Sequence, residues 1–178
     1  MGNLSFDASG GYSITYPKNS LLQELPENNE SVKRMMRGLE LKLVKNGLLD
    51  QFNACLKQFI DTGIVKPVSA FPEMETMQKS FIPLCYSSAN NDQATTKLRI
   101  CTNSSFKGNS KVPSFNDTCI SGPDYLNGLK PILTRWRFAA KTAHSDIGKC
   151  YHRISTSLPD NSLRRLWLKP VLGTDVPW

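Results

Sequence analysis

The clearest pattern of apolar and polar residues lies between residues 29 and 63. Apolar side chains recur there at intervals of three and four residues, which places them on one face of a helix. The first run contains Val32, Met35, Met36, Leu39 and Leu43. The second run contains Leu49, Phe52, Leu56, Phe59 and Ile60. The pattern predicts two amphipathic helices whose apolar faces belong to the core.

Polar and glycine residues predict where these two helices begin and end. Asn28 or Asn29 is suited to cap the first helix by accepting backbone N–H hydrogen bonds. Asn46-Gly47 separates the two runs, and Gly63 stands where a left-handed helix end favours glycine.

Shorter apolar runs predict strands on either side of the helix pair. Residues 12–16 alternate before a proline, and residues 64–68 follow the second helix. Residues 80–85 and 95–101 flank a polar turn, so we expect them to form a hairpin. Side chains repeat every second residue along a strand, which would place Lys97 and Arg99 on one face of that hairpin.

The later part of the chain has weaker patterns. Residues 125–138 predict a helix, and Pro131 is suited to the first turn of such a helix. Residues 158–161 read as a turn, and residues 163–168 as a strand.

Composition and charge indicate a folded protein with a polyanionic partner. The chain has 178 residues, of which 39% are hydrophobic and 21% charged, enough to build one core. The formal net charge is +7, and the stretch from Lys130 to Lys169 holds nine basic residues against two acidic ones. Such a basic half favours nucleic acid as a partner, although a solvated basic face is the simpler alternative.

Several classes of protein are not expected. The five cysteines are widely spaced and form no C-x-x-C or C-x-x-H pair, so we expect reduced thiols and no zinc site. The chain begins with no signal-peptide pattern and contains no apolar run of membrane-spanning length. We therefore expect an intracellular protein, cytoplasmic or nuclear, with no membrane partner.

Five short motifs occur in a fixed order along the chain. They read T-T-K-L-R at 95–99, S-F-N-D at 114–117 followed by G-P, I-L-T-R-W-R at 132–137, D-I-G-K-C-Y-H-R-I at 146–154, and L-W at 166–167. Together these motifs resemble the reverse transcriptase of Bel/Pao-type retrotransposons, part of a pol polyprotein, over about residues 12–169.

The resemblance implies an α+β fold, namely a partial right-hand polymerase with the fingers and the first part of the palm. Residues 1–28 would be an N-terminal extended segment, residues 29–138 a fingers-like region, and residues 139–178 the start of the palm. A strand would deliver the first catalytic carboxylate at the beginning of that palm.

The resemblance also implies roles for individual residues. Asp146 would be the catalytic carboxylate and, with the backbone carbonyl of Ile147, would bind Mg²⁺. Tyr151 would pack under the nucleotide sugar and so select deoxynucleotides. Arg99, and less strongly Lys97, would bind the triphosphate, because a guanidinium fork suits phosphate oxygens.

The basic stretch supplies further candidates for contacts with an RNA or DNA primer–template. They are Arg135, Arg137 and Lys149.

Two features argue against polymerase activity of this chain by itself. Two-metal nucleotidyl transfer needs several carboxylates around ions about 3.5–4 Å apart. The family supplies the others from a Y-x-D-D hairpin, whereas the nine aspartates here include no adjacent pair. We therefore expect a chain that is truncated before the second catalytic motif and is inactive by itself. The family motif is also altered, since Arg165 stands where an aromatic residue is usual.

Each assignment has a structural alternative. Tyr151 would serve equally as a packing residue, and Arg99 as a solvent-facing strand residue. Trp136 and Trp167 could stack on bases, but packing is the favoured interpretation for both indoles. For the whole chain, the alternatives are a non-enzymatic basic nucleic-acid-binding remnant and an inert product that folds poorly.

Overall fold

The computed structural model describes residues 4–6, 11–88, 98–146 and 154–168 of the chain. Helices and short strands are mixed along these residues, so the predicted α+β class is confirmed.

A pair of helices forms the largest part of the fold. Helix α1 spans Asn29–Lys45 and helix α2 spans Leu49–Asp61, as the apolar periodicity predicted. The side chains buried from α1 are Val32, Met36 and Leu43, and those from α2 are Phe52 and Leu56. Met35 lies outside this stripe, with 36% of its surface exposed, so its assignment to the core was wrong.

The ends of the helices show one confirmed expectation and one different outcome. Gly63 follows α2 with a φ of 70°, the left-handed conformation that glycine adopts without strain. Asn28 precedes α1 but makes no side-chain capping bond. Its side chain instead donates to the Phe81 carbonyl at 2.9 Å and accepts from the Phe81 N–H at 2.8 Å. Asn28 therefore joins the start of α1 to a segment 53 residues away.

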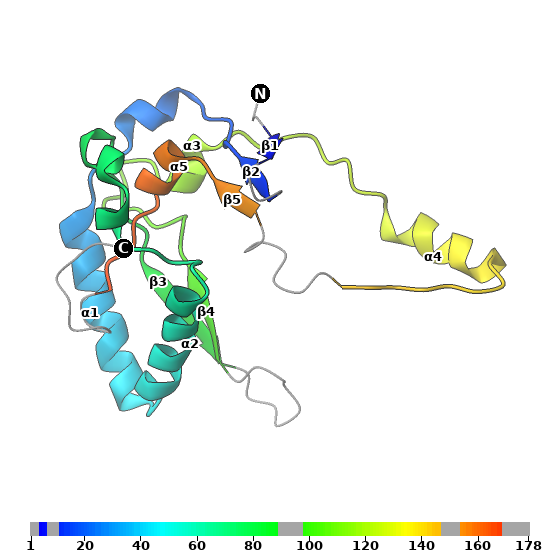
Figure 1. Ribbon diagram of the computed structural model, residues 1–178, viewed down its shortest axis with the longest axis horizontal. Coiled ribbons are helices and arrows are strands. Elements are labelled where there is room, and N and C mark those ends of the chain that lie inside the picture. The colour runs from blue at the N-terminus through cyan, green and yellow to red at the C-terminus, as the bar shows by residue number, and fades with distance from the viewer. Residues whose placement is uncertain (1–3, 7–10, 89–97, 147–153, 169–178) are drawn as a thin grey trace.

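An antiparallel hairpin packs against the helix pair (Figure 1). Strand β3 spans Leu84–Ser88 and strand β4 spans Leu98–Thr102, with Ser87 opposite Arg99. The hairpin was predicted, although β3 begins four residues later than expected because Pro83 precedes it. Leu84 and Leu98 join the buried side chains of α1 and α2 in one core cluster.

A second, smaller cluster links the early and late parts of the chain. Strand β1 (Leu4–Phe6) pairs antiparallel with β2 (Tyr12–Ile14), and β2 pairs in parallel with β5 (Ile154–Thr156). Four side chains are buried in this cluster. Leu25 follows helix η1 (Ser20–Glu24), and Phe115 belongs to α3 (Phe115–Thr118). Ile82 lies just before β3, and Leu163 follows helix α5 (Leu158–Ser162).

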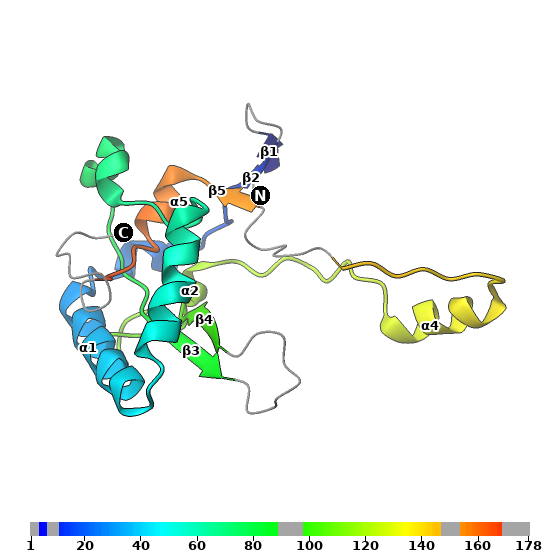
Figure 2. The same ribbon diagram turned by 60° about the horizontal axis from the view of Figure 1, so that its bottom comes forward.

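The third part of the structure is a projecting segment, residues 121–146, which we call the arm. It contains helix α4, Leu129–Phe138, and both views show it extending away from the remaining described residues, which we call the body (Figures 1 and 2). Every arm residue except Ile132 is exposed. Helix α4 begins four residues later than predicted, after Gly128.

Several predicted short elements were wrong. Residues 64–68 form no strand, and 3-10 helices η2 (Val68–Ala70) and η3 (Pro72–Thr76) follow them. Residues 158–161 are helical, within α5 (Leu158–Ser162), rather than a turn. In residues 163–168, expected as a strand, Arg165 makes only an isolated parallel bridge with Phe81. These short runs carry too little periodicity to distinguish a strand from a helix.

The strand that was expected to deliver Asp146 is also absent from residues 139–146, which are extended but unpaired. Residues 147–153, where the catalytic motif continues, lie outside the described part of the chain, as do residues 89–97.

Candidate nucleic-acid interface

Asp146 is exposed at the end of the arm. Among the described residues, no group of three or more histidine, cysteine, aspartate or glutamate side chains could hold a metal ion. Ile147, the other expected metal ligand, lies outside the described residues. The Mg²⁺ site therefore stays a prediction from the sequence.

The expected nucleotide-binding residues are divided between two parts of the molecule. Arg99 is exposed on β4, between the buried Leu98 and the half-buried Ile100, so its guanidinium is accessible to a ligand. It belongs to the body, whereas Asp146 belongs to the arm. Lys97 and Tyr151 fall outside the described residues, and their roles stay predictions.

Helix α4 presents cations and apolar side chains together on the surface. Arg135 and Arg137, two of the predicted nucleic-acid contacts, are exposed in its last turn, where positive charge is favoured by the helix dipole. Lys130 is exposed in its first turn. The third predicted contact, Lys149, is outside the described residues. No acidic residue occurs between Asp124 and Asp146, so the cations of α4 have no neighbouring carboxylate in sequence.

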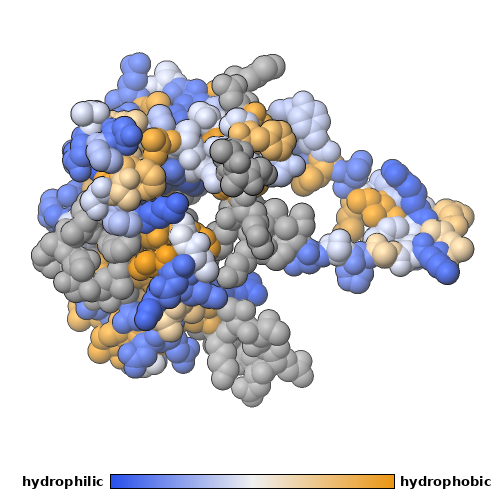
Figure 3. All heavy atoms as spheres, viewed as in Figure 1, coloured by the Kyte–Doolittle hydropathy of each residue, from blue (hydrophilic) through white to orange (hydrophobic). Residues whose placement is uncertain are grey.

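An apolar stripe runs between these cations. Leu129, Leu133 and Trp136 follow the spacing that places side chains on one helix face, and they are 68%, 46% and 41% exposed. At 100° per residue, Lys130 and Arg137 flank the stripe on one side and Arg135 on the other. Figure 3 shows hydrophilic and hydrophobic residues side by side on the arm. The arrangement matches a surface that pairs phosphates with cations and stacks a base on an aromatic ring.

The two candidate tryptophans differ in their surroundings. Trp167 is half-buried, with its ring 6.4 Å from that of Phe81 in an edge-on arrangement. The Lys33 ammonium lies 4.6 Å from the centre of the Trp167 ring. Trp167 is therefore a packing residue, and Trp136 is the indole that remains accessible for stacking.

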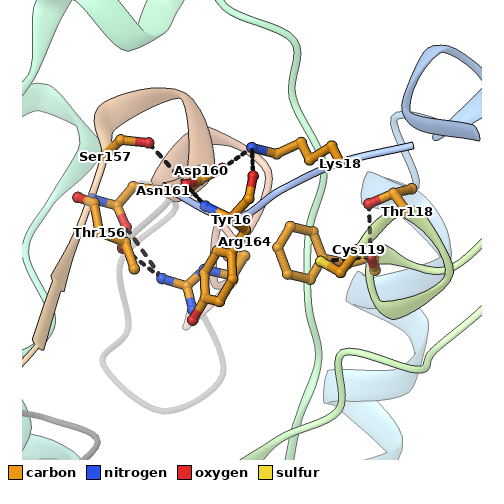
Figure 4. Close-up of polar contacts among 10 residues, drawn as sticks. Tyr16, Lys18, Thr118, Cys119, Thr156, Ser157, Asp160, Asn161 and Arg164 are labelled. Atoms are coloured by element: carbon orange, nitrogen blue, oxygen red, sulfur yellow. Dashed lines mark hydrogen bonds and ion pairs between the residues drawn. The ribbon is translucent and has the colours of Figure 1, made fainter. Parts of the chain in front are cut away.

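A buried polar network, which the sequence did not predict, lies at the junction of β2 and α5 (Figure 4). Asp160 is fully buried and accepts hydrogen bonds from the Tyr16 N–H and the Ser157 hydroxyl, each at 2.9 Å. Lys18 forms an ion pair with the same carboxylate. The network supplies every Asp160 oxygen with a partner, which a buried carboxylate requires. It fixes the N-terminal segment to the late helix.

Arg164 completes this junction from the other side. Its guanidinium donates to the Thr156 hydroxyl at 2.7 Å and lies 5.4 Å from the centre of the Tyr16 ring. The Ser-x-x-Asp spacing of Ser157 and Asp160 is a helix-start signal that could have revealed α5.

The same spacing recurs at Ser114 and Asp117, where the structure forms a full capping box at the start of α3. Lys107 donates to the Asp117 carboxylate at 2.8 Å. This hydrogen bond, followed by that from the Ser114 backbone, lowers the pKa of Asp117 to about 2. These residues support the fold, and nothing in their geometry indicates a ligand.

No protein-family model, curated protein or solved structure matches the chain. The resemblance to Bel/Pao-type reverse transcriptases therefore stays a prediction from the ordered motifs. None of the helices in the described residues is long and apolar enough to cross a membrane.

Proposed function

We propose that the chain is the fingers and the first part of the palm of a Bel/Pao-type reverse transcriptase, and that by itself it binds nucleic acid without copying it. The observation that carries the binding function is the exposed basic surface of α4, with its accessible indole. The motif order from T-T-K-L-R to L-W carries the assignment to the family.

The body is compatible with a fingers region. A helix pair supports a hairpin whose outer residue, Arg99, is exposed and whose inner residues are buried in the core. A rigid support of this kind lowers the entropy lost when a cation is positioned against a phosphate group. In a complete polymerase, Arg99 and Lys97 would bind the incoming triphosphate, and Tyr151 would contact its sugar.

The arm would contact the primer–template. Arg135, Arg137 and Lys130 neutralise phosphates and release their counterions, which gives affinity that falls with salt concentration. Trp136 stacks on an unpaired base at the template end, where bases are accessible. Lys149 would extend the same basic surface.

Copying requires more carboxylates than this chain supplies at its candidate site. Asp146 and the Ile147 carbonyl would hold Mg²⁺, and the bound ion would offset the negative charge of the reacting phosphates. A single carboxylate does not offset the charge of two such ions. Activity would require a protein that also contributes the Y-x-D-D carboxylates. We expect no primer extension by this chain with Mg²⁺ and deoxynucleotides, and extension above background would contradict that part of the proposal.

Binding is tested by fluorescence anisotropy with a labelled primer–template, titrated at several salt concentrations. We expect the double variant Arg135→Met/Arg137→Met to bind at least about tenfold more weakly at low salt. The slope of log affinity against log salt should fall by about 1.8, or about 0.9 for each cation removed from a duplex contact.

The matched control is Arg34→Met/Arg37→Met, which removes the same charge from exposed positions on α1. Equal losses in the two double variants would assign the affinity to net charge and not to α4. Absence of binding by the unmodified chain at low salt would overturn the proposal.

A further inference from the structure

The body contains a cavity of about 840 Å³ that the proposed function does not use. Apolar residues of α2 and β4 line part of it, including Leu56, Phe59 and Ile100. Lys66, Arg164 and Arg165 line it as well, and none of the lining residues that the structure describes is acidic. Its volume lies in the range of small-molecule sites, and its lining combines apolar side chains with polar and basic ones.

Arg165 is the unusual group in this cavity, because its charge is buried without a counterion. The residue is 4% exposed, and no carboxylate of the described residues lies within ion-pair distance of its guanidinium. One nitrogen, Nη2, donates to the Met74 carbonyl and, at 3.0 Å, to the Ser162 hydroxyl. The Nε atom is buried and has no hydrogen-bond partner among the described residues.

An arginine in this position raises the free energy of the folded state unless an anion accompanies it. Isolated buried charges are costly, and buried ions in proteins are normally paired. Burial lowers the pKa of Arg165, and the carboxylates of Glu75 and Glu27, too distant for an ion pair, act against this effect. An arginine side chain nevertheless stays protonated, so an anion bound in the cavity would stabilise its charge.

Arg164 adds a second guanidinium, half-buried, that also has one unpartnered nitrogen. Its Nη2 atom is bonded to Thr156 and Asn161, whereas its Nε atom is buried and unpartnered among the described residues. Two adjacent arginines and the exposed Lys66 thus bring three positive charges to one cavity. A carboxylate would balance one of these charges, whereas a phosphate monoester carries about two negative charges and presents three acceptor oxygens.

We propose that this cavity binds a small phosphate monoester with an apolar or aromatic body. The phosphate is held by Arg165 and Arg164, whose guanidinium groups form strong hydrogen bonds with phosphate oxygens. The body of the ligand lies on the apolar wall of α2 and β4. This proposal is independent of nucleic-acid binding by the arm.

Isothermal titration calorimetry with phenyl phosphate tests the proposal on the full chain, with inorganic phosphate and benzyl alcohol as comparison ligands. We expect phenyl phosphate to bind most tightly, inorganic phosphate more weakly and benzyl alcohol not measurably. Equal affinity for phenyl phosphate and inorganic phosphate would overturn the role of the apolar wall. Absence of phenyl phosphate binding at millimolar concentration would overturn the whole proposal.

The variant Arg165→Met separates binding from support of the fold. We expect at least about tenfold weaker phenyl phosphate binding, because a charged hydrogen bond is lost. Without ligand, its thermal midpoint should be equal or higher, because an unpaired buried charge is replaced by an apolar side chain. Unchanged phenyl phosphate binding would contradict the proposal, whatever the thermal midpoint of the variant.

Two further variants guard against a general effect of charge or of misfolding. Arg34→Met removes an exposed arginine of α1 and should leave phenyl phosphate binding unchanged. Arg164→Met, at a half-buried position, should weaken phenyl phosphate binding even where Arg165→Met fails to fold. Primer–template binding by Arg165→Met should match that of the unmodified chain, so that failure of this proposal and failure of the nucleic-acid proposal are distinguishable.

Discussion

The body and the arm use the same kinds of residues in opposite ways. Phe52 of α2 is fully buried in the body, whereas Phe138 of α4 is 87% exposed in the arm. Asp160 is fully buried with three partners, whereas Asp146 is exposed. Residue type and helical periodicity are therefore insufficient to assign a side chain to the core. What differs is whether a second element lies over the apolar face.

The helices of the body and the helix of the arm should differ in stability, because a helix is stabilised mainly by packing. A ten-residue helix is marginal by itself in water, so most helices depend on packing of an apolar face. Helices α1 and α2 obtain that packing from the hairpin, and α4 does not obtain it from the body. The stability of the protein should therefore depend on the body alone, and contacts with the primer–template should depend on the arm.

The largest expected effect comes from a matched pair of phenylalanine substitutions. Phe52→Ala leaves a cavity in the core and should lower the free energy of unfolding by about 4 kcal/mol. Phe138→Ala removes an exposed side chain and should change it by less than about 0.5 kcal/mol. Urea unfolding followed by circular dichroism measures both. Similar losses in the two variants would show that the arm packs against the body in solution.

A matched pair of aspartate substitutions sharpens the comparison for charged residues. Asp160→Asn leaves Lys18, whose side chain is 14% exposed, without its counterion, and should lower the free energy of unfolding by about 3 kcal/mol. Asp146→Asn should leave the unfolding curve unchanged. Chemical unfolding at neutral pH measures the two values. An Asp160→Asn protein as stable as the unmodified chain would show that the network does not stabilise the fold.

The smallest effect concerns acid sensitivity of the body. The pKa of Asp117 is lowered from 3.8 to about 2, chiefly by the hydrogen bond from Lys107. The stabilisation is therefore complete above about pH 4 and is lost as the pH falls through about 2. Asp117→Asn should flatten the dependence of the thermal midpoint on pH in this window. Lys107→Met should reproduce part of that flattening, and an unchanged profile in both variants would contradict the assigned cause.

The sequence predicted the parts of the fold that have long periodic patterns. The α1–α2 pair spans more than thirty residues with apolar side chains at helical spacing, and the hairpin has two strands about a polar turn. Local preference and tertiary packing agree in these elements, which makes them readable without a structure.

The sequence did not predict elements whose conformation depends on distant contacts. Residues 163–168 read as a strand, yet Arg165 pairs with Phe81 through a single bridge because the chain turns immediately after α5. The cavity was equally hidden, because its lining residues come from segments between Tyr16 and Leu166. The arm was missed because the spacing in α4 matches that of a packed helix.

The way the arm is attached predicts that the body does not need an intact arm to stay together. Lys18 pairs with Cys119 just before the arm, and Tyr12 pairs with Ile154, the first described residue after it, so the described residues on both sides of the arm pair with one N-terminal segment. The arm is thus an excursion that closes at its base. A protease cut within it should yield two pieces that stay associated, and the protein should be reconstitutable from two separately produced halves.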